Sequence, residues 1–225
     1  LASPVDVAEL PGFADGLCSV QDEAAQLAAT ALGCAPGDRV LDACAAPGGK
    51  SCHLLERCPD IAELVAMDSD ASRLERVADN AARLALPVRC VAADASAPPA
   101  DLEPLSFDRI LVDAPCSASG VVRRHPDIKL LRRPSDPLGF AEQQLAILEG
   151  VWPLLRPGGT LLYVTCSIFS DENDDLVARF LDTGVPATVA PLQATWGVPT
   201  RHGRQTLPHP QGPDGLYFAR LRKAE

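Results

Sequence analysis

The chain has 225 residues, of which 47% are hydrophobic, and its formal net charge at pH 7 is −10. That length suits one sizeable α/β core, or such a core with a small appendage. The acidic balance argues against a protein that coats nucleic acid with its whole surface, although it permits a local basic groove. No apolar run reaches the roughly 20 residues of a membrane span, and the start of the chain shows no signal-peptide pattern.

The number and spacing of the cysteines limit which metal sites and which cellular compartment the sequence allows. The eight cysteines include no Cys-x-x-Cys pair and the four histidines are scattered, so we expect no metal site. Without a visible signal peptide, the cysteines predict reduced thiols and a cytoplasmic protein. We also expect a monomer with no membrane partner.

In chain order, the pattern first predicts an irregular lead-in over residues 1–18 and then a helix over 19–32. Ser19 is the expected N-cap of this helix, and Gly33 supplies its stop. Residues 1–36 therefore precede the first predicted strand.

Short apolar strands and helices then alternate along the chain. Strands are expected at 39–43, 63–68, 88–94, 107–113, 160–165 and 216–221. Helices are expected at 49–55, 70–84, 138–155 and 171–181, the second of them capped by Asp70. This alternation predicts a doubly wound, mainly parallel α/β sheet, which binds ligands at the carboxyl ends of its strands.

The stretch 40–51 (Val-Leu-Asp-Ala-Cys-Ala-Ala-Pro-Gly-Gly-Lys-Ser) joins the first strand to a helix through a turn of small residues. Small residues let the backbone approach a ligand, and the free N–H groups of the helix face it. Cys44 stands where a P-loop needs a glycine, so ATP and GTP are disfavoured. The dinucleotide fingerprint needs three spaced glycines, whereas Gly48 and Gly49 are adjacent. S-adenosylmethionine, which lacks a polyphosphate, fits better, and an ordinary tight turn is the alternative.

Three successive apolar runs after this turn end in an acid, namely Asp68, Asp94 and Asp113. One such aspartate is ordinary, because Asp often begins a turn, but three favour a nucleoside-containing ligand. Asp68 lies about twenty residues beyond the glycines, the offset at which an acid receives ribose hydroxyls in dinucleotide folds. We expect Asp94 to meet the adenine edge.

Cys116 and Cys166 each follow a predicted strand, so both are expected at the ligand-binding edge. A packing role is more common for either cysteine alone. A thiolate is, however, a strong nucleophile. Carbon 5 of a pyrimidine becomes reactive toward methylation only after a thiolate adds to carbon 6. Two thiols and a carboxylate at one edge suit that chemistry.

Three motifs, in this order, closely resemble those of the RNA cytosine-5 methyltransferases. They are Asp-Ala-Cys-Ala-Ala-Pro-Gly-Gly-Lys (42–50), Asp-Ala-Pro-Cys-Ser-x-Ser-Gly (113–120) and Thr-Cys-Ser (165–167). The stretch 122–132 resembles the branch that acts on bacterial 16S ribosomal RNA (methyltransferase B). The resemblance runs from about Gly12 to Lys223 and implies a Rossmann-like class I methyltransferase that depends on S-adenosylmethionine.

The resemblance also implies roles at matching positions. Cys166 would add to carbon 6 of cytosine, Cys116 would help release the methylated product, and Asp113 would hydrogen-bond the base near its ring nitrogen. The residues implied to hold S-adenosylmethionine are Cys44, Ala45, Ala46, Pro47, Gly48, Gly49, Lys50, Asp68, Asp94 and Asp113.

Basic residues cluster beside the Cys116 loop. Such clusters are often only solvated loops, but next to the expected site they predict contacts to RNA phosphates and salt-sensitive binding. The expected RNA contacts are Arg123, Arg124, His125, Lys129 and Arg132. Because the target cytosine must leave its stack to reach Cys166, we expect an unstacked base as substrate.

The 16S branch usually carries a helical RNA-binding domain ahead of the catalytic one, and nothing in this sequence resembles it. We therefore expect residues 1–225 to form the methyltransferase catalytic domain alone. Ribosomal RNA is the expected substrate because of the stretch 122–132. A transfer RNA cytosine-5 methyltransferase would share the other motifs, and a non-catalytic RNA-binding or ribosome-assembly module would share the fold.

Overall fold

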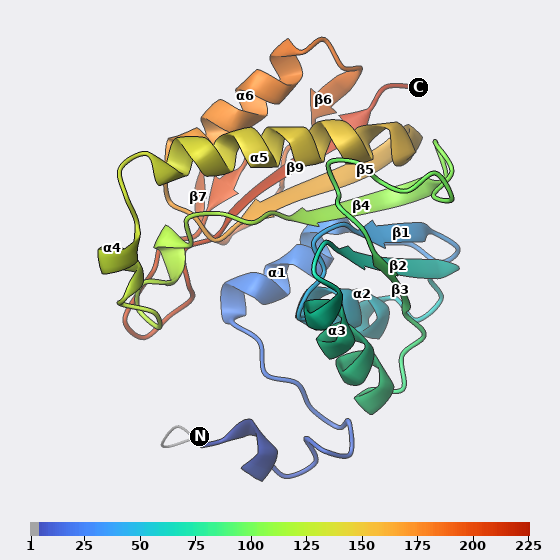
Figure 1. The fold of residues 1–225 in the computed structure, drawn as a ribbon, viewed down its shortest axis with the longest axis vertical. Helices are drawn as coiled ribbons and strands as arrows, with labels where there is room; N and C mark the ends of the chain where they lie inside the picture. Colours follow the sequence, from blue (N-terminus) through green and yellow to red (C-terminus); the bar gives the residue numbers. More distant parts are fainter. Residues whose placement is uncertain (1–4) are drawn as a thin grey trace.

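The computed structural model describes residues 5–225, and residues 1–4 of the expected lead-in lie outside them. A nine-stranded sheet runs through the middle of the molecule (Figure 1). Its strands are β1 (Arg39–Asp42), β2 (Glu63–Asp68), β3 (Arg89–Ala92), β4 (Phe107–Asp113), β5 (Leu155–Thr165), β6 (Ala187–Val189), β7 (Val198–Pro199), β8 (Arg204–Gln205) and β9 (Tyr217–Lys223). The strand order is β3-β2-β1-β4-β5-β9-β8-β7, with β6 also paired to β9. The pairs among β1 to β5 are parallel and the others antiparallel, which confirms a mainly parallel sheet.

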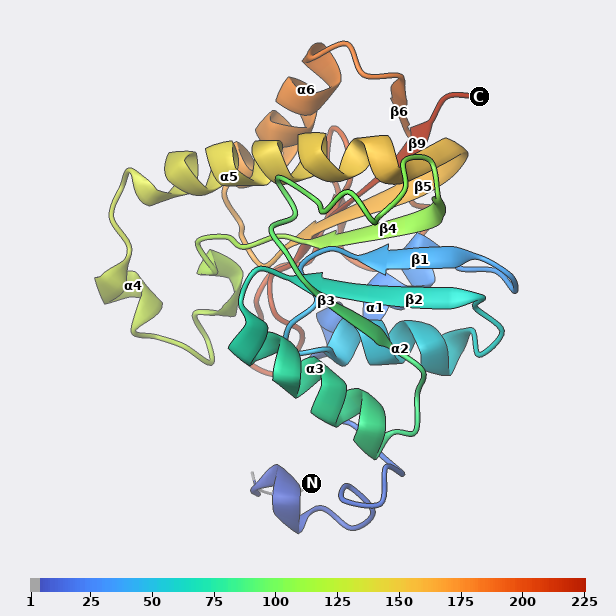
Figure 2. The same cartoon turned by 45° about the vertical axis from the view of Figure 1, so that its right-hand side comes forward.

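Helices cover both faces of this sheet. They are α1 (Glu23–Leu32), α2 (Gly49–Arg57), α3 (Ala71–Arg83), α4 (Ile128–Leu131), α5 (Asp136–Val151) and α6 (Asp174–Asp182). In Figures 1 and 2, α1, α2 and α3 lie on one face and α5 and α6 on the other. This is the doubly wound arrangement that the sequence predicts. None of the helices within residues 5–225 is both long and apolar enough to cross a membrane.

Alternation of side chains along each strand builds one hydrophobic core on each face. Val40, Leu64 and Leu111 pack with residues of α1, α2 and α3. Their strand neighbours Leu41 and Ile110 pack with residues of α5 and α6 instead. Since both faces are covered by helices, the central strands read as continuous apolar runs in the sequence.

Capping side chains determine where the helices begin, and the cap of one helix differs from the prediction. α3 follows Asp70, whose carboxylate caps it as predicted. α1 is capped by Asp22, which accepts a 2.9 Å hydrogen bond from Ala24 N, so the prediction of Ser19 as N-cap is wrong. Gly33 ends α1 in the left-handed conformation, with φ at 66°, as predicted.

Two further boundaries shift because short 3-10 turns replace α-helix. α5 gives way to a 3-10 helix at Trp152–Leu154, so the prediction of an α-helix reaching residue 155 is wrong. Pro153 lacks the backbone N–H that a continuing helix needs. α6 likewise begins later than predicted, because residues 170–172 form a 3-10 turn ahead of it. Strands β6, β7 and β8 and helix α4 are not predicted from the sequence.

The carboxyl ends of β1, β2, β4 and β5 meet at one edge of the sheet, toward the left of Figure 1. The strand order reverses between β1 and β4, so a crevice opens at this edge between the loops that follow them. The turn into α2 follows β1, and the Cys116 loop follows β4. The fold therefore brings the turn before α2 and the Cys116 and Cys166 loops to the same edge of the sheet.

Candidate active site

The two cysteines predicted at the sheet edge lie against each other. Cys116 is in the loop after β4, Cys166 directly follows β5, and their Sγ atoms are 3.3 Å apart as free thiols. The strand register explains the proximity, since Asp113 of β4 pairs with Val164 of β5 in parallel. Gly120 N also donates a 2.9 Å hydrogen bond to Cys166 O, which ties the two loops together.

A cavity of about 350 Å³ opens beside these thiols. Cys116 and Cys166 both line it, and so do five of the residues predicted to hold the methyl donor. These five are Cys44, Ala46, Asp68, Asp94 and Asp113. Further residues of α3 and α5 that the sequence motifs do not mark also line it, namely Arg73, Gln143 and Ile147.

The turn after β1 is held in shape by its own contacts. Asp68 accepts hydrogen bonds from Ala46 N and from Asp70 N, each at 3.1 Å. Two bonds leave acceptor capacity on this carboxylate, which has about four lone-pair sites. Gly48 has φ at 99°, and a Cβ there would lie 3.0 Å from Val77 Cα, so only glycine fits. Arg73 also lies 3.7 Å from this carboxylate. Small residues and a carboxylate with remaining acceptor capacity at this cavity suit a nucleoside-containing ligand.

Lys50 does not line the cavity but pairs with one of its acids. Its Nζ donates a 2.6 Å hydrogen bond to Asp113 Oδ2, and only 14% of its side chain is exposed. Asp42, at the end of β1, is fully buried and accepts a 2.6 Å hydrogen bond from Ser51 Oγ. Burial raises the pKa of Asp42 to about 7, although the Ser51 hydrogen bond opposes this rise.

The two thiols differ in acidity. The hydrogen bond from Cys116 lowers the pKa of Cys166, and the positive charge of Lys50 lowers it further, against burial and the charge of Asp113. The same hydrogen bond and burial raise the pKa of Cys116 well above its usual range. Cys166 is therefore the more acidic of the two thiols.

The predicted RNA-contacting residues divide into two groups. Arg124 Nε donates a 2.7 Å hydrogen bond to Asp214, and Arg123 lies 3.4 Å from the same buried carboxylate. Arg132 Nε donates to Ser117 O at 2.7 Å and so braces the Cys116 loop. The two remaining residues, His125 and Lys129, are exposed.

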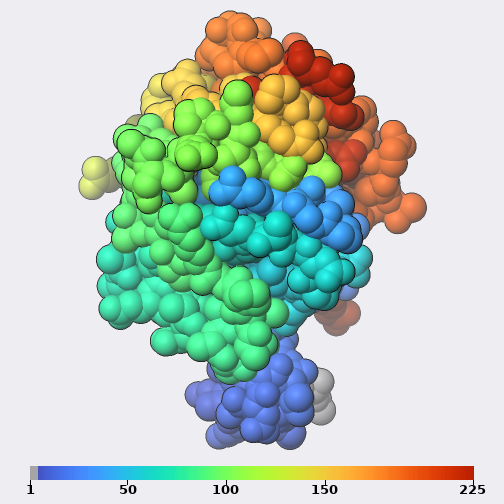
Figure 3. Space-filling view, turned by 90° about the vertical axis from the view of Figure 1, so that its right-hand side faces the viewer, coloured from blue at the N-terminus to red at the C-terminus, as the bar shows by residue number. Residues whose placement is uncertain are grey.

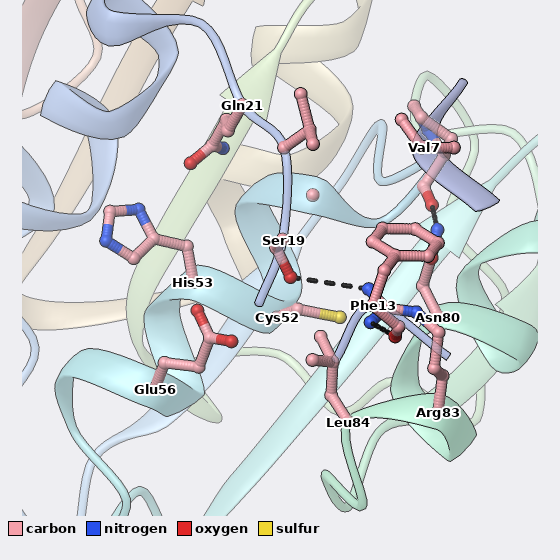
Figure 4. A pocket seen from close by; sticks show the side chains of 13 residues that line it. Val7, Phe13, Ser19, Gln21, Cys52, His53, Glu56, Asn80, Arg83 and Leu84 are labelled. Atoms are coloured by element: carbon pink, nitrogen blue, oxygen red, sulfur yellow. Dashed lines mark hydrogen bonds between the residues drawn. The ribbon is translucent and has the colours of Figure 1, made fainter. Parts of the chain in front are cut away.

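A second, smaller cavity of about 170 Å³ lies between the lead-in, α2 and α3 (Figure 4). The lead-in projects from the body as the dark-blue knob of Figure 3. Arg83 holds it there, because its guanidinium stacks 4.0 Å from the Phe13 ring centroid and donates to Phe13 O and Cys18 O. Pro47 and Gly49, predicted to hold the methyl donor, line this second cavity. No residue lines both cavities, so the second one is separate from the thiols.

A buried polar cluster behind the thiols is absent from the sequence analysis. It consists of Ser117, Ser119, Gln144, Ser167 and Glu172, joined by hydrogen bonds. Glu172 stands in an acidic run of the kind that is usually solvated, and no sequence signal marks it as buried.

Solved structures with the same architecture include methyltransferases. A methyltransferase homologue from Pyrococcus horikoshii is 29% identical, with a TM-score of 0.83, and the match covers 98% of this chain and 73% of that one. The NSun6 structure from the same organism is 28% identical, with a TM-score of 0.88, covering 99% and 57%. The fold and site thus define a Rossmann-like methyltransferase with two thiols at its ligand-binding edge.

Sequence comparison places the chain in one family within this class of methyltransferase. The family model described as 16S rRNA methyltransferase RsmB/F matches residues 29–222, and the chain belongs to that family. Ribosomal RNA small subunit methyltransferase B from Pseudomonas syringae pv. tomato is 50% identical over 99% of this chain and 51% of its own length. The Shewanella oneidensis protein of the same name is 51% identical over 100% and 52%. The chain spans about half the length of these curated relatives, and the predicted family resemblance is confirmed.

Proposed function

We propose that the protein is an S-adenosylmethionine-dependent RNA methyltransferase that methylates carbon 5 of a cytosine in 16S ribosomal RNA. The observation that best supports this proposal is the pair of thiols, which lie 3.3 Å apart and differ in acidity, beside a cavity lined with aspartates. The names of the most similar relatives support ribosomal RNA as the substrate. In this proposal the chain is the catalytic domain of a cytoplasmic, monomeric enzyme.

The cavity fits the methyl donor. The NSun6 structure contains SFG, an S-adenosylmethionine analogue. In this chain, Asp68 would bind the ribose hydroxyls, Asp94 would meet the adenine edge, and Cys44 and Ala46, which line the cavity, would pack against the ligand. When bound, S-adenosylmethionine supplies a methyl group on a positively charged sulfur. The chain's residues prepare the base that receives it.

Cys166 begins the reaction as a thiolate. Its Sγ forms a bond to carbon 6 of cytosine, and the electron pair of the 5,6 double bond moves to carbon 5, which takes the methyl group. Asp113 hydrogen-bonds the base near its ring nitrogen, and Lys50 holds Asp113 in place. Carbon 5 then loses its proton to solvent water, the electrons of that C–H bond reform the 5,6 double bond, and the Cys166 thiolate leaves with the electrons of the C–S bond. Cys116 assists this release, because its thiol donates a hydrogen bond to the departing sulfur.

Exposed basic residues near the Cys116 loop would contact the RNA backbone. Lys129 and His125 are free to reach phosphates, whereas Arg123, Arg124 and Arg132 would do so from positions fixed by their contacts within the protein. The cytosine enters unstacked, since the thiols lie within a cavity rather than on a flat surface.

Methyl transfer to defined RNAs tests this function. The protein is incubated with methyl-labelled S-adenosylmethionine and either 16S ribosomal RNA or transfer RNA, and bisulfite sequencing then locates 5-methylcytosine. We expect one modified cytosine in the ribosomal RNA. Modification of transfer RNA alone would favour the alternative substrate. Binding of RNA without any methylation would favour a non-catalytic module.

A further inference from the structure

The loops that carry the two thiols rest on one buried carboxylate. Glu172, which ends the 3-10 turn before α6, is 0% exposed. Its Oε1 accepts hydrogen bonds from Ser117 N at 2.7 Å and from Gln144 Nε2 at 3.2 Å. Its Oε2 accepts from Ser117 Oγ and from Ser167 Oγ, each at 2.5 Å. Four donors match the four lone-pair sites of an ionised carboxylate.

In the part of the chain that the structure describes, no cation is paired with this charge. The ion pairs found within residues 5–225 include none with Glu172. A carboxylate is costly to bury, and well-packed apolar side chains are often at least as stabilising as a buried charge. We therefore look for the role of Glu172 in the groups that its hydrogen bonds hold in place.

Glu172 contacts the loops of both thiols. Ser117 directly follows Cys116 in the chain, and Ser167 directly follows Cys166. One carboxylate thus holds the residue next to each sulfur. The hydroxyls of Ser117 and Ser167 lie 3.2 Å apart, and the two sulfurs lie 3.3 Å apart.

We propose that Glu172 is a positioning residue, whose carboxylate holds the Cys116 and Cys166 loops together so that the Cys116 thiol donates its hydrogen bond to Cys166. The inference rests on the proposed function, since it separates the roles of the two thiols in that reaction. Glu172 acts through Ser117 and Ser167 and does not line the cavity.

Electrostatics acts in the same direction as the geometry. The pKa of Cys116 is raised by its hydrogen bond to Cys166 and by burial, and the negative charge of Glu172 raises it further. Charged groups that act on Cys166 include Asp113 and Lys50, which have opposite effects on its pKa. The charge of Arg124 also interacts with Cys166. The charge of Glu172 therefore favours a proton on Cys116 and a thiolate at Cys166.

Thiol alkylation tests this role without RNA or methyl donor. Iodoacetamide is added to the wild-type protein and to Glu172→Gln across a range of pH, and peptide mass spectrometry gives the rate at each cysteine. We expect the ratio of the Cys166 rate to the Cys116 rate to fall about tenfold in Glu172→Gln, the change in thiolate fraction that one pKa unit produces. The control is Glu142→Gln, which removes an exposed carboxylate of α5 and should keep the wild-type ratio. An unchanged ratio in folded Glu172→Gln overturns the proposal.

A second variant decides the matter if Glu172→Gln does not fold. Ser167→Ala keeps the buried charge but releases the Cys166 loop from it. We expect Cys166 alkylation near neutral pH to slow about tenfold, because the hydrogen bond that lowers its pKa is lost. Unchanged alkylation would overturn the proposal. Failure of the wild-type protein to methylate RNA would instead refute the proposed function, and the alkylation ratio would still test Glu172.

Discussion

Lys50 Nζ donates a 2.6 Å hydrogen bond to Asp113 Oδ2 and so joins the first turn of α2 to the end of β4. The pair stands beside Cys166, whose pKa is lowered by the charge of Lys50 and raised by that of Asp113. A residue of the turn proposed to hold the methyl donor therefore also acts on the proposed nucleophile. This coupling gives the first prediction.

Replacing Lys50 by glutamine should make Cys166 less reactive. Without the lysine charge, the pKa of Cys166 rises, and the charge of Asp113 is left unopposed. We expect the pH of half-maximal Cys166 alkylation to move upward and methylation near pH 7 to fall by about tenfold or more. The matched control is Arg57→Gln, an exposed cation at the other end of α2. An alkylation profile identical to that of the wild type would contradict the role given to Lys50.

The buried carboxyl of Asp42 should make folding stability depend on pH. Its pKa is about 7 in the folded protein against an ordinary value of 3.8, so the unfolded chain releases this proton first. Stability from this group is therefore lost as the pH rises from about 4 to 7. Asp42→Asn should gain stability relative to the wild type across that window, by up to about 4 kcal/mol.

Urea unfolding at several pH values measures this difference. The control Asp60→Asn removes an exposed carboxylate and should follow the wild-type curve. Parallel curves for the wild type and Asp42→Asn would show that Asp42 titrates normally in the folded protein.

Gly120 should tolerate no side chain. A Cβ at Gly120 would lie 1.8 Å from Gly215 O and 3.0 Å from Cys166 O, so Gly120→Ala must push the Cys116 loop away from the backbone at Gly215 and strain its contact with Cys166. We expect a loss of about 1–3 kcal/mol in unfolding free energy, together with slower methylation. Gly139→Ala is the control, because a Cβ there meets nothing within 4 Å on α5. It should be neutral or stabilise by up to about 1 kcal/mol. Equal effects of the two changes would be inconsistent with the close approach.

Arg83 should hold the lead-in against the body. It stacks on Phe13 and donates hydrogen bonds to Phe13 O at 2.7 Å and to Cys18 O at 3.0 Å. We expect Arg83→Met to raise hydrogen exchange in residues 5–22 about fivefold or more, since losing such bonds costs about 1–3 kcal/mol. Arg76→Met, on the exposed side of α3, should leave exchange there unchanged. Unaltered exchange in Arg83→Met would mean that other contacts hold the segment.

The central fold could be predicted because its strands are buried on both faces. The runs 63–68 and 107–113 each carry a buried apolar stretch (64–67 and 110–112) that ends in an acid, and the structure matches both bounds in full. The predicted helix boundaries are wrong where a capping side chain or a proline decides the end of the helix. Asp22 lies closer to the first helical turn than Ser19 does, and Pro153 stops α5 early. The short strands β6, β7 and β8 carry no periodic signal, because their pairing depends on β9 or on one another.

The sequence predicts only those site residues that lie in motifs or at the ends of predicted strands. Cys116, Cys166 and Asp113 follow strands, and parallel pairing brings them together. The partners of charged residues are decided by tertiary structure. Lys50 turns to Asp113 rather than to the cavity, and Glu172 is buried although it lies in an acidic run. No spacing rule reveals either contact.

Covalent attachment to RNA tests the division of labour between the thiols most directly. Each variant is incubated with 16S ribosomal RNA and S-adenosylmethionine, and protein–RNA adducts are resolved by denaturing electrophoresis. We predict that Cys116→Ala accumulates an adduct, because release is impaired, and that Cys166→Ala forms neither an adduct nor methylated RNA. An adduct in Cys166→Ala, or normal turnover of Cys116→Ala without an adduct, would contradict the account.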